Sequence, residues 1–205
     1  MDKKLPIYRM VLDPEKEDSG IDFIALVDEP AIQTHWFVFK KEEQLQPPNT
    51  DHKFLFKADS DRKIIVSPAM IPDLPIYRRN EQMGEFYVIF DKQQINLLQE
   101  KFMEKNFINN INVMHDDKQQ VSGVFMKNSW VSDSTMGIKP PDMFSDLPDG
   151  TWFISYKFKN EDMWQKFVKE GEFKGVSVEG MFDLVPYKKT FEEQFLEIVN
   201  QITQD

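Results

Sequence analysis

Short apolar runs, each stopped by turn residues, form the hydrophobic pattern of the first ninety residues. These runs occupy residues 7–12, 21–27, 36–39, 64–66 and 86–90, and Asp-Pro, Gly or charged positions separate them. Runs of this length with such boundaries are typical of β-strands. The intervening stretch 41–63 is polar, and we expect it to be a long loop that encloses one small strand at 54–56.

After residue 90 the apolar spacing changes and predicts a helix. Asp91 can cap its N-terminus, and Ile95, Leu98 and Phe102 recur at i, i+3 and i+7. The stretch 106–112 ends this helix.

Strands are expected again in the second half, at residues 113–115, 121–131 and 151–158. The first two would be joined by a polar turn at 116–120. Residues 132–150 are rich in Asp, Pro, Ser and Gly, which predicts a second long loop.

Two helices and a strand region complete the predicted elements. Asn160 can cap one helix, which Gly171 stops, and residues 173–184 form the last strand region. A capping box at Thr190 begins a C-terminal helix. Its apolar residues fall on one stripe: Phe191, Phe195, Ile198 and Ile202.

About eight short strands with three helices indicate an α+β domain. The strands do not alternate one for one with helices, which disfavours a doubly wound parallel sheet, and the sequence has no glycine-rich phosphate loop of either common type. A mainly antiparallel barrel or a strongly bent sheet fits better. We expect residues 1–188 to form this domain and residues 189–205 to form an appended amphipathic helix.

Composition narrows the chemistry. The chain has 205 residues, with 25 Lys and Arg against 35 Asp and Glu, and a net charge of −10. Such an acidic chain disfavours direct nucleic-acid binding and docking on anionic membranes. It has no cysteine and three histidines, which excludes thiol chemistry and disfavours a metal site built mainly from imidazole. We therefore expect no cofactor and no metal, and an enzyme would use hydroxyl, carboxylate or imidazole chemistry.

Among the histidines, His115 has the context of a general base. It ends a short apolar strand and precedes Asp116 and Asp117, whose carboxylates favour its charged form. The alternative is a solvated turn histidine. His35 and His52 have the contexts of a partly buried strand residue and a solvated loop residue.

Among the serines, Ser177 lies within a strand, while most of the others lie in loops. Period-two alternation places it on one face with Gly175 and Glu179. A glycine and a carboxylate beside a serine allow another chain to approach closely. The alternative interpretation is a polar strand face turned to water.

The order of these residues excludes the common serine-hydrolase plans. The α/β-hydrolase elbow needs a second glycine where Glu179 stands and a histidine after the serine, which is missing here. A Gly-Asp-Ser-Gly surround is absent, and a Ser-x-x-Lys dyad would need lysine at Gly180. What remains is a strand histidine followed much later by a strand serine.

This order resembles the assembly proteases of herpesviruses and the prohead proteases of phages, and most closely the phage serine protease family of the XkdF-like type. The run His115-Asp116-Asp117 with Gly123 is similar to their histidine strand, and residues 175–180 are similar to their serine strand. Further similar stretches are 26–32, 67–73, 76–78, 84–88, 150–152 and 171–173. Together they span about residues 8–182.

The resemblance implies a closed β-barrel surrounded by helices. It also implies an endopeptidase that cleaves scaffold and capsid proteins inside the immature head in the host cytoplasm. By matching position, Ser177 would be the nucleophile and His115 its general base. The herpesvirus enzymes add a histidine after the serine, which this chain lacks. We rank Glu179, then Asp116, then His35 as the group that would orient the base.

The implied partners are the scaffold protein, the major capsid protein and the portal, and the C-terminal helix would pack on the barrel or form a homodimer. Two other functions stay open. One is a non-catalytic assembly module of the same fold that binds scaffold or portal. The other is a metal hydrolase that uses His115, Asp116 and Asp117, although neighbouring strand residues point to opposite faces and share one ion poorly.

Overall fold

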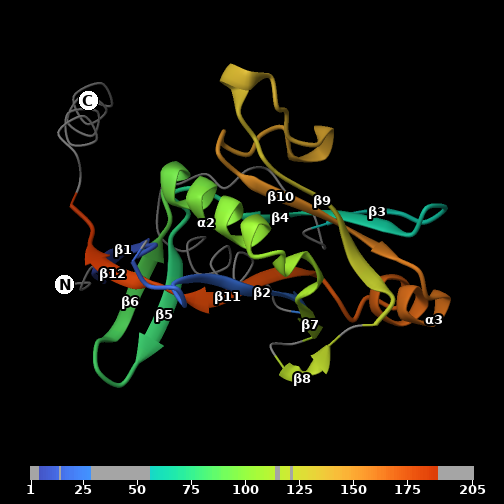
Figure 1. Ribbon diagram of the computed structural model, residues 1–205, viewed down its shortest axis with the longest axis horizontal. Helices are drawn as coiled ribbons and strands as arrows, with labels where there is room; N and C mark the ends of the chain where they lie inside the picture. Colours follow the sequence, from blue (N-terminus) through green and yellow to red (C-terminus); the bar gives the residue numbers. More distant parts are fainter. Residues whose placement is uncertain (1–4, 14, 29–55, 114–115, 121, 189–205) are drawn as a thin grey trace, which may run out of the picture.

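The computed structural model describes residues 5–13, 15–28, 56–113, 116–120 and 122–188. Its described strands form three sheets of four strands each (Figure 1). The strands are β1 (Ile7–Val11), β2 (Gly20–Val27), β3 (Lys57–Asp59), β4 (Ile64–Met70), β5 (Ile76–Asn80), β6 (Gly84–Ile89), β7 (Ile111–Val113), β8 (Asp116–Gln120), β9 (Val124–Val131), β10 (Trp152–Phe158), β11 (Gly175–Met181) and β12 (Asp183–Pro186).

All three sheets are open, so the predicted α+β closed barrel surrounded by helices is wrong. Their strand orders are β12-β1-β6-β5, β3-β4-β10-β9 and β11-β2-β7-β8. A sheet closes only when its first and last strands pair, and among the described strands none of these outer pairs forms. The chain instead passes between sheets. A bulge between Glu179 and Gly180 bends the end of β11, and the chain continues as β12 at the edge of another sheet. The molecule is therefore a β-rich fold of open sheets.

The aromatic residues of β10 form the centre of the core. Each of its apolar side chains is at most 1% exposed: Trp152, Phe153, Ile154, Tyr156 and Phe158. β10 lies between β4 and β9, so both of its edges are paired. Burial on both faces explains why this strand is apolar at nearly every position rather than at alternate ones.

Helix α2 (Lys92–Glu104) covers this core, as its apolar spacing predicted. The Asp91 side chain accepts a hydrogen bond of 2.8 Å from the backbone N–H of Gln94 and so caps the first turn. Ile95, Leu98 and Phe102 are all buried. The Phe102 ring meets Trp152 edge to face, with centroids 5.6 Å apart.

The second predicted helix is also present, with a wider turn than expected. Asn160 caps α3 (Glu161–Met163), which continues as the π-helical segment η4 (Trp164–Lys169). Trp164, Phe167 and Val168 are buried in the core. Gly171 follows with φ +78°, the left-handed conformation that ends helices most easily at glycine.

Three strands differ from the sequence prediction, and all three lie at sheet edges. The expected turn at 116–120 is strand β8, and neither β5 nor β3 was predicted. Most of the small strand expected at 54–56 lies outside the described residues. An edge strand packs against fewer neighbouring residues than a central strand does, so it needs fewer apolar side chains. Its sequence therefore resembles that of a loop, which is why hydrophobic pattern alone missed these strands.

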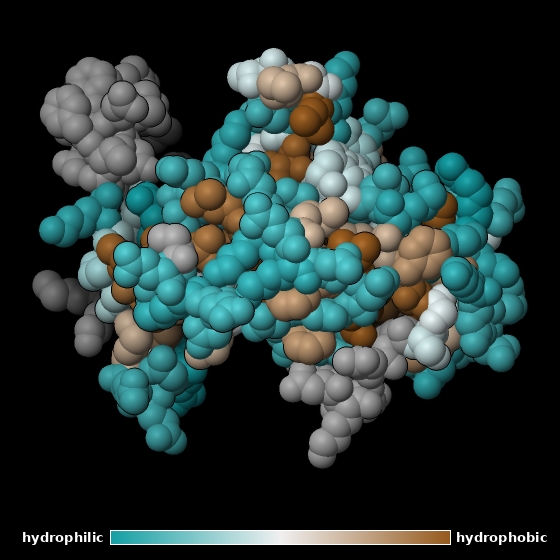
Figure 2. Space-filling view, viewed as in Figure 1, coloured by the Kyte–Doolittle hydropathy of each residue, from teal (hydrophilic) through white to brown (hydrophobic). Residues whose placement is uncertain are grey.

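The predicted loop at 132–150 is irregular, with two short 3₁₀ turns at Ser134–Met136 and Asp142–Phe144. Asp149 anchors it by accepting hydrogen bonds from Lys92 Nζ at 2.6 Å and from the backbone N–H of Ser134 at 2.8 Å. Figure 2 shows a mostly hydrophilic face with scattered apolar patches, one of them over this loop, where Met136 is exposed.

The elements predicted at 36–39 and 189–205 lie outside the described residues. Among the helices that are described, none is both long and apolar enough to cross a membrane.

Candidate active site

Ser177 lies in the middle of β11. Val176 belongs to the hydrophobic core, and alternation along the strand places Ser177 on the other face from Val176. Across the sheet, Ser177 is in register with Ala25 of β2, and Ala25 is in register with Asn112 of β7. Ser177 is 8% exposed, and the other two are fully buried. This face is therefore not the solvated polar face of the alternative interpretation.

β11 is an edge strand whose one partner among the described strands is β2. Beside it, Ser177 lines a cavity of about 40 Å³ together with Val176 and Val178. The remaining wall is apolar except for Arg78, and comprises Met10, Ala69, Met70, Ile71, Leu74, Ile76, Phe90 and Phe182. An edge strand can pair with another extended chain. Ser177 thus lines a cavity beside a strand edge, where a peptide paired with β11 would place its side chains.

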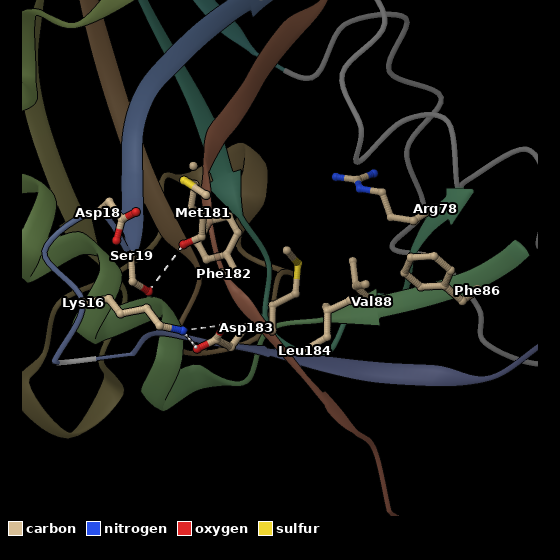
Figure 3. A pocket seen from close by; sticks show the side chains of 12 residues that line it. Lys16, Asp18, Ser19, Arg78, Phe86, Val88, Met181, Phe182, Asp183 and Leu184 are labelled. Carbon is tan, nitrogen blue, oxygen red and sulfur yellow. Dashed lines mark hydrogen bonds and ion pairs between the residues drawn. The ribbon is translucent and has the colours of Figure 1, made fainter. Parts of the chain in front are cut away.

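A larger pocket of about 410 Å³ extends from this cavity toward β12 (Figure 3). The two share Met10, Arg78 and Phe182 as lining residues. On the side of the larger pocket away from Arg78, Lys16 Nζ lies 2.9 Å from an Asp183 carboxylate oxygen. Because they share these three residues, the two adjoin each other beside β11 and the start of β12, and together they are called the groove.

Gly180 fixes the shape of this groove. A Cβ atom at Gly180 would lie 1.8 Å from the backbone oxygen of Gly20 and 2.8 Å from the Cα of Ile21. The bulge in β11 therefore brings the two backbones together as closely as only glycine permits. Beyond it, Met181 makes an isolated bridge to Ser19 before the chain enters β12.

Glu179 shares the face of Ser177, and its side chain reaches across β2. Its Oε2 accepts a hydrogen bond of 2.9 Å from Nδ2 of Asn112. Asn112 is fully buried, and its Oδ1 has no hydrogen-bond donor in the described part of the chain. The carboxylate of Glu179 is thus held near β7, the strand that precedes His115 in the sequence.

The structure places the other predicted site residues only in part. His115 and His35 lie outside the described residues. Asp116 opens β8 and pairs through its backbone with Val113, the last residue of β7. Of the strand expected at 113–115, only Val113 lies inside the described residues, as the last residue of β7. Among the described residues, no group of three or more His, Asp or Glu side chains could hold a metal ion.

The model of one protein family matches residues 51–185, about two thirds of the chain. That family is described as "Putative phage serine protease XkdF". The chain belongs to this family. Membership of this phage serine protease family confirms the resemblance inferred from the sequence. No curated protein and no solved structure gives a significant match.

The match to the phage serine protease family includes four of the five predicted site residues. Ser177, His115, Glu179 and Asp116 lie inside the matched range, and His35 lies before it. The family description agrees with a peptidase that uses serine.

Two residues of the site were missed by the sequence reasoning, Asn112 and Arg78. Asn112 interrupts the apolar run of β7, and a polar residue between Ile111 and Val113 was a signal that it has a specific partner. Arg78 gave no such signal, because it lies among other polar residues of an edge strand. Only the tertiary structure brings Arg78 and Ser177 to the wall of the same cavity.

The Asn112–Glu179 contact leads to a pH-dependent prediction. In the variant Asn112→Asp, a buried carboxyl group would face the Glu179 carboxylate, and the pKa of the introduced group would be raised above its ordinary value of about 4. Because this folded-state pKa is raised, the variant keeps its stability below about pH 4, where the introduced group is protonated in both the folded and the unfolded chain. It loses stability as the pH rises above that value. We expect this variant to lose about 3 kcal/mol or more relative to the wild type at pH 8, measured by urea unfolding.

The control variant Asn112→Ala removes the amide without adding a charge. It should lose about 1–3 kcal/mol, with a much smaller change between pH 5 and pH 8. An Asn112→Asp variant that is equally destabilised at both pH values would contradict the assigned contact.

Proposed function

We propose that this chain is a serine endopeptidase that cleaves scaffold and capsid proteins during phage head maturation, with Ser177 as the nucleophile and His115 as the general base. The observation that carries the proposal is the position of Ser177 on an edge strand, beside a cavity, in a chain of a phage serine protease family. A serine that served only to fill a polar face would need neither a place at the edge of the described sheet nor a cavity beside it.

The chemistry assigned to these residues is acyl transfer. The Ser177 hydroxyl attacks the scissile carbonyl while His115 accepts its proton, and the resulting tetrahedral intermediate expels the amine as His115 returns the proton. Water then hydrolyses the acyl-enzyme by the same base assistance. Glu179 is the favoured orienting group for His115, because Asn112 holds its carboxylate close to β7.

The proposed substrates and partners follow from the resemblance to head-maturation proteases. They are the scaffold protein, the major capsid protein and the portal of the immature head, in the host cytoplasm. A net charge of −10 suits an enzyme that acts in a space later filled by DNA, because the acidic chain binds phosphate poorly.

Labelling with a fluorophosphonate probe tests the nucleophile and its base together. The wild type should be labelled at Ser177, as located by mass spectrometry of the digested protein. The variant His115→Gln should slow labelling by about 10²–10⁴-fold, the usual contribution of a general base. His52→Gln is the matched control, since His52 has the context of a solvated loop residue, and it should leave the rate unchanged.

The same experiment separates the peptidase from a non-catalytic assembly module. A folded wild-type protein that the probe does not label, and that is retained intact in assembled heads, would contradict the enzymatic proposal. Labelling at a serine other than Ser177 would contradict the assignment of the nucleophile.

A further inference from the structure

Arg78 holds a distinctive position beside the proposed nucleophile. It lines both the small cavity at Ser177 and the larger pocket that follows it. In Figure 3 its side chain extends from β5 toward the segment that joins β11 and β12. Arg78 thus places a positive charge where the small cavity and the larger pocket meet.

No carboxylate in the described part of the chain forms an ion pair with Arg78. Its guanidinium donates a 3.0 Å hydrogen bond to the backbone oxygen of the neighbouring Tyr77. Lys16, at the other side of the groove, is instead paired with Asp13 and Asp183. A chain with ten more acidic than basic residues has many carboxylates to offer, and yet none of those described meets this arginine.

Arg78 is an exposed residue whose guanidinium borders both cavities. Partial burial among these walls lowers the pKa of Arg78. The group nevertheless stays charged at neutral pH. An arginine that meets no carboxylate in the described residues can form charge-assisted hydrogen bonds with a carboxylate of a bound chain. Such bonds are among the strongest in proteins.

The small cavity limits the neighbouring side chain of a bound peptide. Its volume of about 40 Å³ is a few times the ~10–15 Å³ that one water molecule requires on the same measure. Its walls are apolar apart from Ser177 and Arg78. A short aliphatic side chain fits such a space, whereas an aromatic ring would not.

We propose that the groove selects extended peptides that place a short aliphatic side chain in the Ser177 cavity and present an acidic side chain to Arg78. This inference rests on the proposed peptidase function, and it names the class of substrate. The backbone of the peptide would lie along the edge of β11 that pairs with none of the described strands. Arg78 is then a specificity-determining residue and takes no part in the bond cleavage itself.

A cleavage profile on a peptide library prepared from a digested host-cell proteome tests the proposal. Wild-type cleavage sites, identified by mass spectrometry, should be enriched in Asp or Glu at one position close to the scissile bond. For a synthetic peptide pair that differs by Glu or Gln at that position, Arg78→Gln should lower kcat/KM for the Glu peptide by about 10- to 100-fold. The Gln peptide should change little, and Arg78→Glu should shift the preference toward Lys.

Arg79→Gln is the matched control. Arg79 is the next residue of β5, lines neither cavity and is in register with Glu85 on the neighbouring strand. This variant should keep the wild-type profile. A wild-type profile without acidic enrichment, or an equal loss in the Arg78 and Arg79 variants, would overturn the proposal.

Fluorophosphonate labelling of the same preparations distinguishes this failure from a failure of the proposed function. Labelling at Ser177 without an acidic preference rejects the role of Arg78 and leaves the peptidase intact. If Ser177 is not labelled and the library is not cleaved, both proposals are wrong.

Discussion

Replacement of Ser177 by alanine is expected to lower the rate of scaffold and capsid cleavage by about 10⁴-fold or more, because the variant lacks the hydroxyl that we propose attacks the peptide bond. The change removes one oxygen from a strand and keeps the Cβ atom, so β11 should retain its pairing with β2. Thermal unfolding should therefore differ little from that of the wild type. The measurement is mass spectrometry of the termini of scaffold and capsid proteins after co-expression with each variant.

Ser155→Ala provides the control for this experiment. Ser155 is also a buried strand serine, but it lies on β10 in another sheet, and its hydroxyl donates a 3.0 Å hydrogen bond to Asn128. Its loss should cost about 1 kcal/mol of stability and leave the cleavage pattern unchanged. If Ser177→Ala produced the wild-type termini at the wild-type rate, Ser177 could not be the nucleophile.

The variant Gly180→Ala is expected to cause the second large effect, this time on stability. The added Cβ would overlap the backbone oxygen of Gly20, and its three nearest atoms, between 1.8 and 2.8 Å away, all belong to backbone. Side chains can rotate away from such an overlap, but two paired strands must separate. We expect a loss of more than about 3 kcal/mol, which is the range of severe strain in a packed core, measured by urea unfolding.

Gly137→Ala separates this overlap from the ordinary cost of replacing glycine. Gly137 has φ +71°, and a Cβ atom added there would have no other atom within 4 Å. Alanine there should cost about 1–2 kcal/mol because of its left-handed backbone conformation. Equal losses for the two variants would show that the close approach of β11 and β2 at the bulge is not what requires Gly180.

Elements whose signals are local were predictable from the sequence. Helix α2 begins with a capping aspartate and repeats its apolar residues at helical spacing, so neighbouring residues alone define it. The two faces of β11 follow from the alternation of Val176, Ser177 and Val178 for the same reason. Edge strands gave no comparable signal: β5 and β8 are rich in polar residues and become strands because a neighbouring strand pairs with them.

The candidate site shows the same division between local and long-range information. The sequence by itself determined the resemblance to phage serine proteases and the face of β11 on which Ser177 lies. It also led to the hypothesis that Ser177 is the nucleophile and His115 the general base. Tertiary structure alone decided that the sheets are open, that the Ser177 face is buried, and that Asn112 and Arg78 meet the site. The physical reason is that alternation and capping depend on a few neighbouring residues, whereas burial and cavity walls depend on the packing of strands far apart in the chain.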